Sequence, residues 1–483
     1  MNKLLIGGGV VLALGVVGAA VVGPNYLGGK IETVTRAQLT SAVDKPFKAE
    51  LVKYERGTRS SEVEIKIGLD ASCMAANSSA DKTATAPAAS PAAGEAGSDV
   101  FLLYRAHLNH GPFAGGLNAA SYTGELLLPP ALQAKYEEAT GQKVLASFTG
   151  TYGFSGSSNE TITMPKFDVK MDKEAGAESG KLQFLGATLD VKSDAEGKKM
   201  TLTGNMPGAV FESKEAKVTL GASDFTAKLN RIAPGIWESE SSGKLKDVVA
   251  MGGDKPMFKL EGFTFSGANT LDDKKMMTSK VNMAIAKIGA GDSKKEYTNA
   301  VYEFVINNLA AEPMARISAV QNCGMVPVLN ALLGSKGDSK AAKTGLAGLV
   351  ESSEAINANS EATFKTMLAD YKLIAAGNPS VDIKKISVMT PEGLVDVNGQ
   401  VKLAGILESD WSTPMLLLQR LDATANVTFP SLLIPEAMQL MVTKSVTDGF
   451  ATQKDKQLST TLKWSQGKGT LNGKPIEKMM SGG

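Results

Sequence analysis

The 483-residue sequence is poor in the residues that most often carry chemistry. It has two histidines and two cysteines, so a zinc site would also need carboxylates brought in by the fold. Aromatic residues make up 6% of the chain, which argues against a large aromatic-lined pocket, and no cofactor is implied. The 51 basic and 50 acidic residues nearly cancel, and we expect no binding to nucleic acid.

Known catalytic patterns are also missing from the sequence. There is no G-x-S-x-G nucleophile elbow, no Walker A phosphate loop and no H-E-x-x-H zinc motif. The glycine run "IGGGVVLALG" lies inside a hydrophobic segment and not in a β-α-β unit, so it does not indicate dinucleotide binding. We expect a non-enzymatic protein and assign no catalytic residue.

The strongest signal in the chain is its hydrophobic start. Residues 4–23 contain no charged side chain, and as a helix they would be ~30 Å long, the thickness of a bilayer's hydrocarbon core. Lys3 precedes the run, so the N-terminus stays in the cytoplasm and the remaining chain is exported. We predict a transmembrane anchor over residues 1–24. A cleaved signal peptide, with Gly18 and Ala20 before the cut, is the competing interpretation.

Small residues recur at every fourth position of this hydrophobic segment. Gly15, Ala19 and Gly23 would share one face of the helix, where they would let two such helices pack closely. A helix that is merely rich in glycine and alanine explains the same residues. Self-association through the anchor is therefore only weakly indicated.

The rest of the chain is predicted to be mainly β with α insertions. Its parts are a membrane-proximal helix and strand (25–74), a flexible Ala/Ser-rich loop (75–98), an antiparallel β region (99–309), a helical segment (310–378) and a β-rich C-terminal region with one helix (379–483). In the membrane-proximal part, Val63, Ile65 and Ile67 alternate with charged residues, the pattern of a half-buried strand.

Turn residues separate the expected strands. Asp194–Gly197 and Leu271–Lys274 each divide two alternating runs of 6–10 residues, which indicates antiparallel hairpins. Asn398-Gly399 is a further predicted hairpin turn. Between about residues 145 and 308 no segment has helical periodicity, which argues against a doubly wound α/β domain. We therefore predict one large, curved antiparallel sheet after the transmembrane helix.

Two helices are predicted outside the sheet. One opens at Ser360, ends at Gly377-Asn378-Pro379 and belongs to the helical segment near 310–377. This segment is our candidate cover for the apolar face of the sheet. The other helix begins at Pro435, and its buried side is expected to comprise Met438, Met441 and Val442.

Both histidines lie in "HLNHGPFAGG", residues 107–116. On a strand, His107 and His110 would point to opposite faces and could not hold a metal together. The structural interpretation is a turn at the end of a strand, made by His110, Gly111, Pro112 and Phe113. There Pro112 would fix the backbone, Gly111 would allow an unusual angle and Phe113 would anchor in the core. We favour this turn over a metal site.

Other residues could suggest a functional site, but a structural role fits them better. Cys73 and Cys323 could pair in an oxidising compartment, although two separate thiols are the favoured interpretation. Arg231 and Trp237 suggest a binding loop, yet a surface charge and a partly buried ring are more common. The 20 methionines are expected to be core fillers, among them Met276, Met277, Met438, Met441, Met479 and Met480.

Several stretches together resemble the YdgA/YihF-like family of Gram-negative bacteria, whose biochemistry is unassigned. They are "YERGTRSSEVEI", "NHGPFAGG", "YGFSGSSNETITMPKFDV", "LDATANVTFP" and "WSQGKGTLNGKPIE". The resemblance implies inner-membrane anchoring, periplasmic exposure and a β-rich body, and it supplies no catalytic residue. The run of strands is also similar, in pattern alone, to AsmA-like envelope proteins, whose curved sheets are thought to handle lipid.

These observations lead to three hypotheses for the function. The favoured one is a non-enzymatic periplasmic protein, single-pass in the inner membrane, that binds a lipid or an envelope component through its sheet, because a sheet with one apolar face needs a cover. The alternative is a scaffold whose strand edges assemble with its own copies or with an envelope protein. A periplasmic hydrolase is less favoured, since no motif announces a cleft with convergent polar groups.

Overall fold

One antiparallel sheet dominates the fold, and it confirms the prediction of a mainly β protein with few helices. The computed structural model describes residues 47–57, 60–69, 100–110, 118–171, 180–291, 295–324 and 360–477. Among these residues, no helix is long and apolar enough to cross a membrane. The predicted anchor over residues 1–24 and the Ala/Ser-rich loop lie outside the described residues.

The bounds of the strands and helices in the described residues are as follows, in chain order. The strands are β1 (Phe47–Arg56), β2 (Ser60–Leu69), β3 (Val100–His110), β4 (Ala120–Leu127), β5 (Ala146–Tyr152), β6 (Ser158–Met164), β7 (Phe167–Met171), β8 (Gly180–Phe184), β9 (Ala187–Ser193), β10 (Lys199–Met206), β11 (Ala209–Ser213), β12 (Ala216–Leu220), β13 (Ser223–Ala233), β14 (Ile236–Gly252), β15 (Lys255–Leu271), β16 (Met276–Ala290), β17 (Glu296–Ala310), β18 (Ser380–Thr390), β19 (Gly393–Leu403), β20 (Leu421–Pro430), β21 (Thr452–Lys454), β22 (Gln457–Ser465), β23 (Lys468–Leu471) and β24 (Lys474–Pro475). The helices are α4 (Pro130–Thr140), α5 (Ala311–Gly324), α8 (Ser360–Ala376), α9 (Pro414–Leu417) and α10 (Gln439–Thr447).

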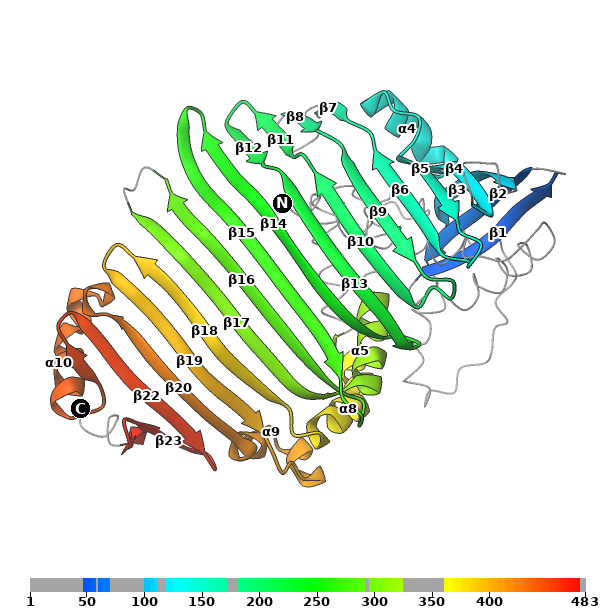
Figure 1. Ribbon diagram of the computed structural model, residues 1–483. Coiled ribbons are helices and arrows are strands. Elements are labelled where there is room, and N and C mark those ends of the chain that lie inside the picture. Colours follow the sequence, from blue (N-terminus) through cyan, green and yellow to red (C-terminus); the bar gives the residue numbers. More distant parts are fainter. Residues whose placement is uncertain are drawn as a thin grey trace, which may run out of the picture.

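The order of strands in space is almost the order in the sequence (Figure 1). From β1 to β6 each strand pairs with the next, and β6 then pairs with β9, which leads through β10 and β13 to β14. A second arm of β7, β8, β11 and β12 joins at β14. From β14 the strands again pair consecutively to β20, and β22 follows.

The central strands are much longer than the predicted 6–10 residues. Strands β14 and β15 have 17 residues each, and β16 and β17 have 15. At about 3.3 Å per residue, a strand of this length spans roughly 55 Å. The first half of β14 pairs with β13 and its second half with β12, so one long strand carries both arms of the sheet.

Near the N-terminal end, two elements were not predicted. Strand β1 pairs with β2 through a bulge at Val52, and on β2 the side chains of Val63, Ile65 and Ile67 are buried as predicted. Helix α4 lies inside the region predicted to be all β. Its first turn contains Pro130, where no helical hydrogen bond is lost, and it ends at Gly141 with φ 70°.

The main hydrophobic core lies on one face of the sheet and spans β2 to β13. It is built from Val63, Ile65, Ile67, Leu102, Tyr104, Ala106, Leu108, Ala120, Tyr122, Leu126, Ala146, Phe148, Tyr152, Ile162, Leu189, Val191, Met200, Leu202 and Ala227. Every second residue of each strand contributes, as the two-residue period of a strand requires. This alternation fixes the register, since a slip by one residue would expose the whole set.

Aromatic rings on this face cover glycines on neighbouring strands. A Cβ at Gly124 would meet the Phe148 ring at 2.1 Å, one at Gly150 would meet Tyr122 at 2.2 Å, and one at Gly204 would meet Phe225 at 2.0 Å. Gly243 is covered in the same way by Phe265. Such aromatic–glycine pairs pin strand register and let the sheet bend.

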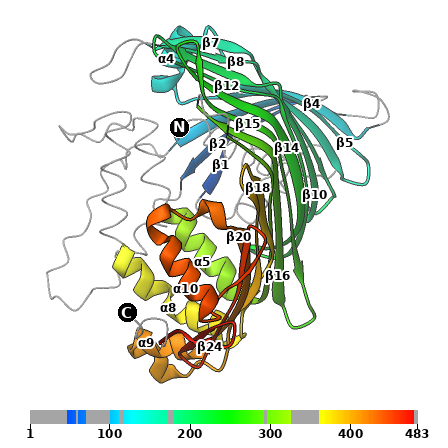
Figure 2. The same cartoon turned by 90° about the vertical axis from the view of Figure 1, so that its left-hand side faces the viewer.

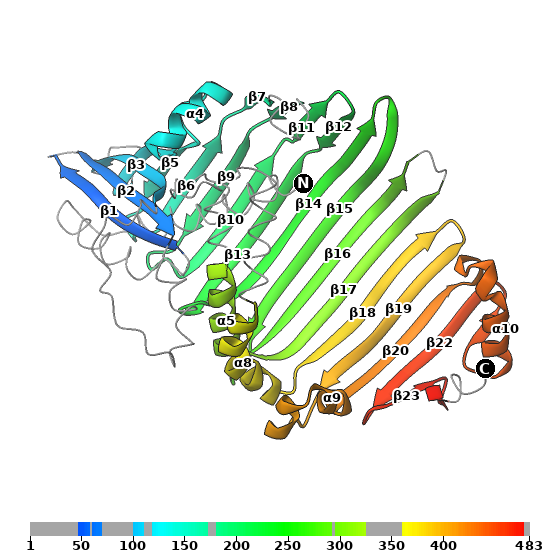
Figure 3. The ribbon, with the colours of Figure 1, turned by 180° about the vertical axis from the view of Figure 1, so that it is seen from behind.

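The helices lie on one side of this curved wall (Figure 2). Helices α5 and α8 pack against each other through Ile317, Met367 and Ile374, and contact β14 and β17. They sit at the edge where β14 begins and β17 ends (Figure 3). Among the described residues, the helical segment thus contacts one margin of the sheet and not its full width.

Two predictions about the C-terminal region are wrong. Asn398-Gly399 does not form a turn but lies inside β19, where a Cβ at Gly399 would meet the backbone oxygen of Thr424 at 2.2 Å. Glycine is thus needed there for the close approach of β20. Helix α10 begins at Gln439 and not at Pro435; Met438 and Met441 are 48% and 58% exposed instead of buried, and Val442 is half-buried.

The aromatic–glycine pairs make a testable prediction about stability. We expect Gly204→Ala to cost about 1–3 kcal/mol, because the new methyl group would displace the Phe225 ring. Gly267→Ala is the matched control, since its Cβ would meet its nearest atoms only at 3.4 Å. Urea unfolding of both variants measures the difference, and equal destabilisation would contradict the role of the ring.

Candidate functional site

The apolar face extends beyond the core across the central and C-terminal strands. Residues that are directly opposite in an antiparallel ladder share a face, so the strand register places these side chains together. The set, which we call the apolar face, continues the core with Phe225, Ala227, Leu229, Phe263, Phe265, Val281, Met283, Ile285, Ala300, Tyr302, Phe304, Ile306, Val381, Ile383, Ile386, Val397, Val401, Ala423, Ala425, Val427 and Leu462.

The opposite face of the same strands is largely polar. Its side chains bond across neighbouring strands: Thr226 with Ser242 at 3.0 Å, and the Asn282 amide donating to Ser266 at 3.2 Å. Further along, the Gln400 amide donates to Asp382 at 2.6 Å. These ladders need no cover because water satisfies them as well.

The two faces therefore differ in what they require. The polar face is stable in contact with water. On the apolar face, each exposed ring or aliphatic group lacks the favourable free energy that its burial would provide. Over β2 to β10 the apolar face is buried, with Ile65 and Leu202 each 1% exposed. Further along, on β15, Phe265 is 37% exposed. The apolar face is thus covered unevenly along the sheet.

A buried carboxyl group interrupts the apolar face. Glu160 on β6 is 3% exposed, and Tyr122 of β4 donates its hydroxyl to the Glu160 Oε2 at 2.7 Å. The residues opposite Glu160 on its two neighbouring strands are Gly150 and Val191. The carboxyl group thus lies among aromatic and aliphatic groups and accepts a hydrogen bond from Tyr122.

Two more tyrosine hydroxyl groups lie buried near this carboxyl group. Tyr104 stacks on Phe148 with ring centroids 4.3 Å apart, and Tyr152 stacks on Tyr122 at 4.9 Å. Within the described part of the chain, the hydroxyls of Tyr104 and Tyr152 have no hydrogen-bond partner. Buried polar atoms without partners are uncommon and mark a place where water or a ligand group fits.

Burial raises the pKa of Glu160 from its ordinary value of 4.5 to about 7, although the hydrogen bond from Tyr122 works in the opposite direction. The pKa values of Tyr104, Tyr122 and Tyr152 are also raised, first by burial. At neutral pH the carboxyl group is therefore balanced between its neutral and charged forms. Sequence analysis missed Glu160, although it alternates with exposed residues in "SNETITM" on the same face as Ile162.

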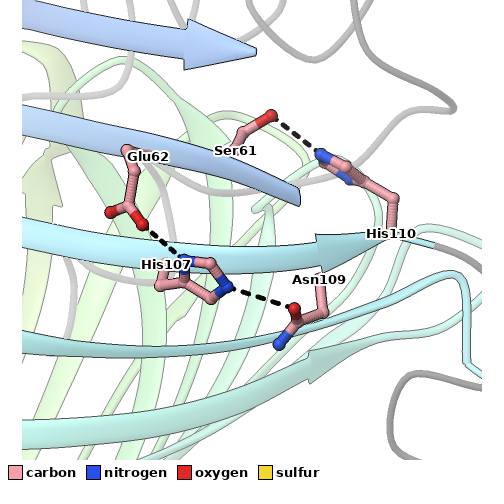
Figure 4. A network of polar contacts seen from close by, with 5 residues as sticks. All are labelled: Ser61, Glu62, His107, Asn109 and His110. Carbon is pink, nitrogen blue, oxygen red and sulfur yellow. Dashed lines mark hydrogen bonds and ion pairs between the residues drawn. The ribbon is translucent and has the colours of Figure 1, made fainter. Parts of the chain in front are cut away.

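The two histidines point to opposite faces of β3, as predicted (Figure 4). His110 Nε2 lies 2.8 Å from the Ser61 hydroxyl, and burial lowers the pKa of His110. His107 donates from Nδ1 to Glu62 at 2.5 Å and contacts Asn109 at 3.1 Å. The hydrogen bond to Glu62 raises the pKa of His107. The structure does not bring the histidines together.

Several predicted positions lie outside the described residues. They are the turn residues Gly111, Pro112 and Phe113, the anchor residues Gly15, Ala19 and Gly23, the thiol of Cys73, and Met479 and Met480. The pairing of Cys73 with Cys323 and the turn after His110 therefore stay predictions. In the described part of the chain, no three His, Cys, Asp or Glu side chains are arranged to hold a metal ion.

Arg231 and Trp237 contact each other near the start of β14. The Arg231 guanidinium lies 5.5 Å from the centroid of the Trp237 ring, a cation–π distance, and the ring is partly buried against the core. This contact joins the β13–β14 hairpin, where the two residues are directly opposite. The partly buried Trp237 ring agrees with the favoured interpretation, whereas Arg231 is half-buried against that ring instead of being a plain surface charge.

Comparison with protein families shows which family the chain belongs to. Residues 1–478 match a family model described as "Bacterial protein of unknown function (DUF945)". The chain belongs to this family. Comparison with curated proteins and with solved structures finds no match. Because the match spans nearly the entire DUF945 chain, the sheet and its apolar face belong to the matched region.

The pKa of Glu160 predicts a pH-dependent stability. Between about pH 4.5 and 7 the folded protein holds a proton that the unfolded chain has released, so stability falls as the pH rises through this window. The difference between 4.5 and about 7 corresponds to roughly 3 kcal/mol. Urea unfolding of the protein at pH 4 and pH 8 measures it.

Glu160→Gln is the variant that isolates this effect. The amide keeps the shape and the hydrogen bond from Tyr122 but cannot ionise. The fall in unfolding free energy as the pH rises through this window should therefore be smaller by roughly 3 kcal/mol than in the parent protein. Glu125→Gln, an exposed carboxyl group on the polar face of β4, is the matched control. An unchanged pH dependence in Glu160→Gln would show that the carboxyl group is not buried as described.

Proposed function

We propose that this DUF945 protein is a non-enzymatic envelope protein that binds a lipid through the apolar face of its sheet. A single N-terminal anchor would hold it in the inner membrane, with the bulk of the chain in the periplasm. The YdgA/YihF-like resemblance is part of the same proposal and supports this location. An apolar face that continues from strand to strand is the observation that carries the proposal.

The geometry of the face suits an extended apolar ligand. Its side chains form continuous rows, because the register aligns Phe265, Met283 and Tyr302 across β15, β16 and β17. Acyl chains of lipids are long and flexible, and they can follow such a row for several strands. Burying apolar area on both sides is favourable by about 25 cal/mol per Å².

The position of the helices supports the proposal. If α5 and α8 packed across the whole width of the sheet, the apolar face would be an ordinary two-layer core. They contact β14 and β17 near one margin instead, and Phe265 stays 37% exposed. The part of the apolar face around Phe265 is where the proposed ligand would lie.

A charge placed on the apolar face tests the proposal. Phe265→Asp should lower the phospholipid that co-purifies with the full-length protein by about tenfold, because burying a carboxylate against acyl chains is unfavourable. Thr264→Asp, the matched control on the polar face of the same strand, should leave the lipid content unchanged. Mass spectrometry of extracted lipid measures both.

The outcome is decisive if both variants keep the circular dichroism and melting temperature of the parent protein. Equal lipid content in the parent and Phe265→Asp would contradict binding to this face. A protein that carries no lipid in any form would also count against the proposal.

A second candidate, a scaffold that binds an envelope protein or its own copies, is favoured by a separate observation. Large apolar side chains are exposed between β20 and β21: Leu432, Leu433, Met438, Leu440 and Met441. Leu440 is 81% exposed. Clusters of this kind mark interaction surfaces. Pairing through the C-terminal sheet edge is less suitable, since β21, β23 and β24 are short and carry Lys454, Lys468, Lys474 and Pro475.

Crosslinking in membranes separates the two candidates. A scaffold should give discrete oligomers or partner bands, and Leu440→Lys should remove them because a charge disfavours an apolar interface. Thr443→Lys, on an exposed part of the same helix, is the control. A monomer without partner bands in the parent protein would argue against the scaffold and leave lipid binding in place.

A further inference from the structure

A row of hairpin tips forms one margin of the C-terminal half of the sheet (Figure 1). The β14–β15, β16–β17 and β18–β19 hairpins end there, and the chain from β20 through α10 to β22 comes next. At ~4.8 Å per strand, the row is roughly 35 Å long. We call it the tip margin, and it comprises residues 252–258, 289–291, 295–298, 389–394 and 430–456.

Neighbouring tips are in contact with each other. Gly291 donates its amide to the backbone oxygen of Met257 at 2.7 Å, which joins the first two hairpins. Lys295 pairs with Glu392 at 3.1 Å, which joins the second and the third. The tip margin is therefore one continuous edge of the molecule.

Large apolar side chains are exposed along the tip margin. They are Met257, Phe258, Met389, Leu394, Leu432, Leu433, Met438, Leu440 and Met441. Met389 and Leu394 are directly opposite each other in the ladder. Because Met389 lies three residues from Ile386 of the apolar face, this pair belongs to the polar face. A ligand on the apolar face cannot cover these two side chains, so the tip margin needs a partner of its own.

The backbone of the tips is suited to an apolar environment. Glu392 donates its amide to the Thr390 hydroxyl at 3.2 Å, and Met438 donates its amide to the backbone oxygen of Pro435 at 2.8 Å. Prolines, which have no amide hydrogen, occupy further positions: Pro256, Pro391, Pro430 and Pro435. A segment whose amides are bonded within the protein loses little when it leaves water.

The opposite margin differs because the chain itself is available to cover it. That margin also exposes apolar side chains, with Ile232 at 50% and Met415 at 70%. Helix α5 ends and α8 begins there, so residues 325–359 start and finish at that margin (Figure 3). On the tip margin between β14 and β22, the structure describes all residues except 292–294.

The proposed anchor brings the tip margin within reach of a bilayer. Residues 4–23 hold no charged side chain, and β1 begins at Phe47. Residues 24–46 join the two and can span at most about 80 Å. The sheet from β1 to β22 measures roughly 75 Å along its curve, at ~4.8 Å per strand. Every part of the sheet can therefore reach the membrane that holds the anchor.

Charged side chains of both signs lie between the apolar ones. The exposed lysines include Lys255 and Lys444, and the exposed acids include Asp254, Glu436 and Asp455. Because the charges are mixed, attraction to an anionic surface is not the main contribution to binding. The favourable contribution comes from removing leucine, methionine and phenylalanine side chains from water.

We propose that the tip margin docks on the surface of a lipid bilayer, with its apolar side chains inserted at the level of the head groups. The inference rests on the anchor of the proposed function and adds a second contact with the membrane. A bilayer surface is fluid and accepts separate tips one by one, whereas a folded partner would have to match all of them in shape. The apolar face ends at this margin, so a docked sheet offers it directly to a lipid that leaves the bilayer.

Fluorescence quenching locates the contact in the full-length protein. The fluorescent amino acid Anap replaces residue 257, 440 or 415, and the protein is reconstituted into vesicles of phosphatidylethanolamine and phosphatidylglycerol. A phospholipid with a nitroxide near its head group quenches probes that enter the interface. Quenching at 257 and 440 should be about threefold stronger than at 415, which is also exposed but lies on the opposite margin.

A charge on the tip margin tests whether the tips insert together. With the probe at residue 257, Leu440→Asp should lower the quenching about threefold, because a carboxylate enters the interface at a cost. Met415→Asp on the opposite margin is the matched control and should leave the quenching unchanged. Added salt should also have little effect, since the contact is apolar.

The outcomes separate this inference from the proposed function. Equal quenching at the three positions, or stronger quenching at 415, would overturn the docking and leave the anchor in place. An apolar shift of the Anap emission at 257 and 440 without nitroxide quenching would show a protein on the margin instead, and would overturn it as well. If the full-length protein does not float with the vesicles, the anchor fails and the docking fails with it. Lipid on the apolar face is measured separately through Phe265→Asp.

Discussion

Alternation of side chains across a continuous hydrogen-bonded ladder is the constraint on which the rest of this structure depends. Each strand presents every second residue to the same side, and the pairings from β1 to β22 pass that arrangement on without a break. Rows of mainly apolar side chains therefore run from strand to strand across one face, with polar rows such as those of Thr226 and Ser242 behind them. A surface of this kind is stable only when something apolar covers it. Its cover is therefore the central question about this protein.

Two features break the uniformity of the apolar face. Aromatic rings lie over Gly124, Gly150, Gly204 and Gly243 and occupy the space that a Cβ would take there. Glu160 with its tyrosines then places a buried polar group among these apolar side chains.

Much of the fold was predictable from the two-residue period. The buried Val63, Ile65 and Ile67, the turn at Asp194–Gly197 and the opposite orientation of His107 and His110 all follow from local sequence. The lengths of the central strands were not predictable. Strand β14 places serine and glycine on its apolar face, so its sequence has no apolar alternation to recognise. Asn398-Gly399 has the composition of a turn, but its glycine serves the approach of β20. The Glu160 cluster depends on residues far apart in the sequence, and only the register brings them together.

The most direct test of the account is photocrosslinking in living cells along one strand. A benzoylphenylalanine placed in turn at residues 281, 282, 283, 284 and 285 of β16 samples both faces within a single element. Lipid adducts at 281, 283 and 285, with none at 282 and 284, are the predicted result, since those three positions belong to the apolar face. Adducts at all five positions, or at none of them, would contradict the claim that this face of the sheet holds lipid.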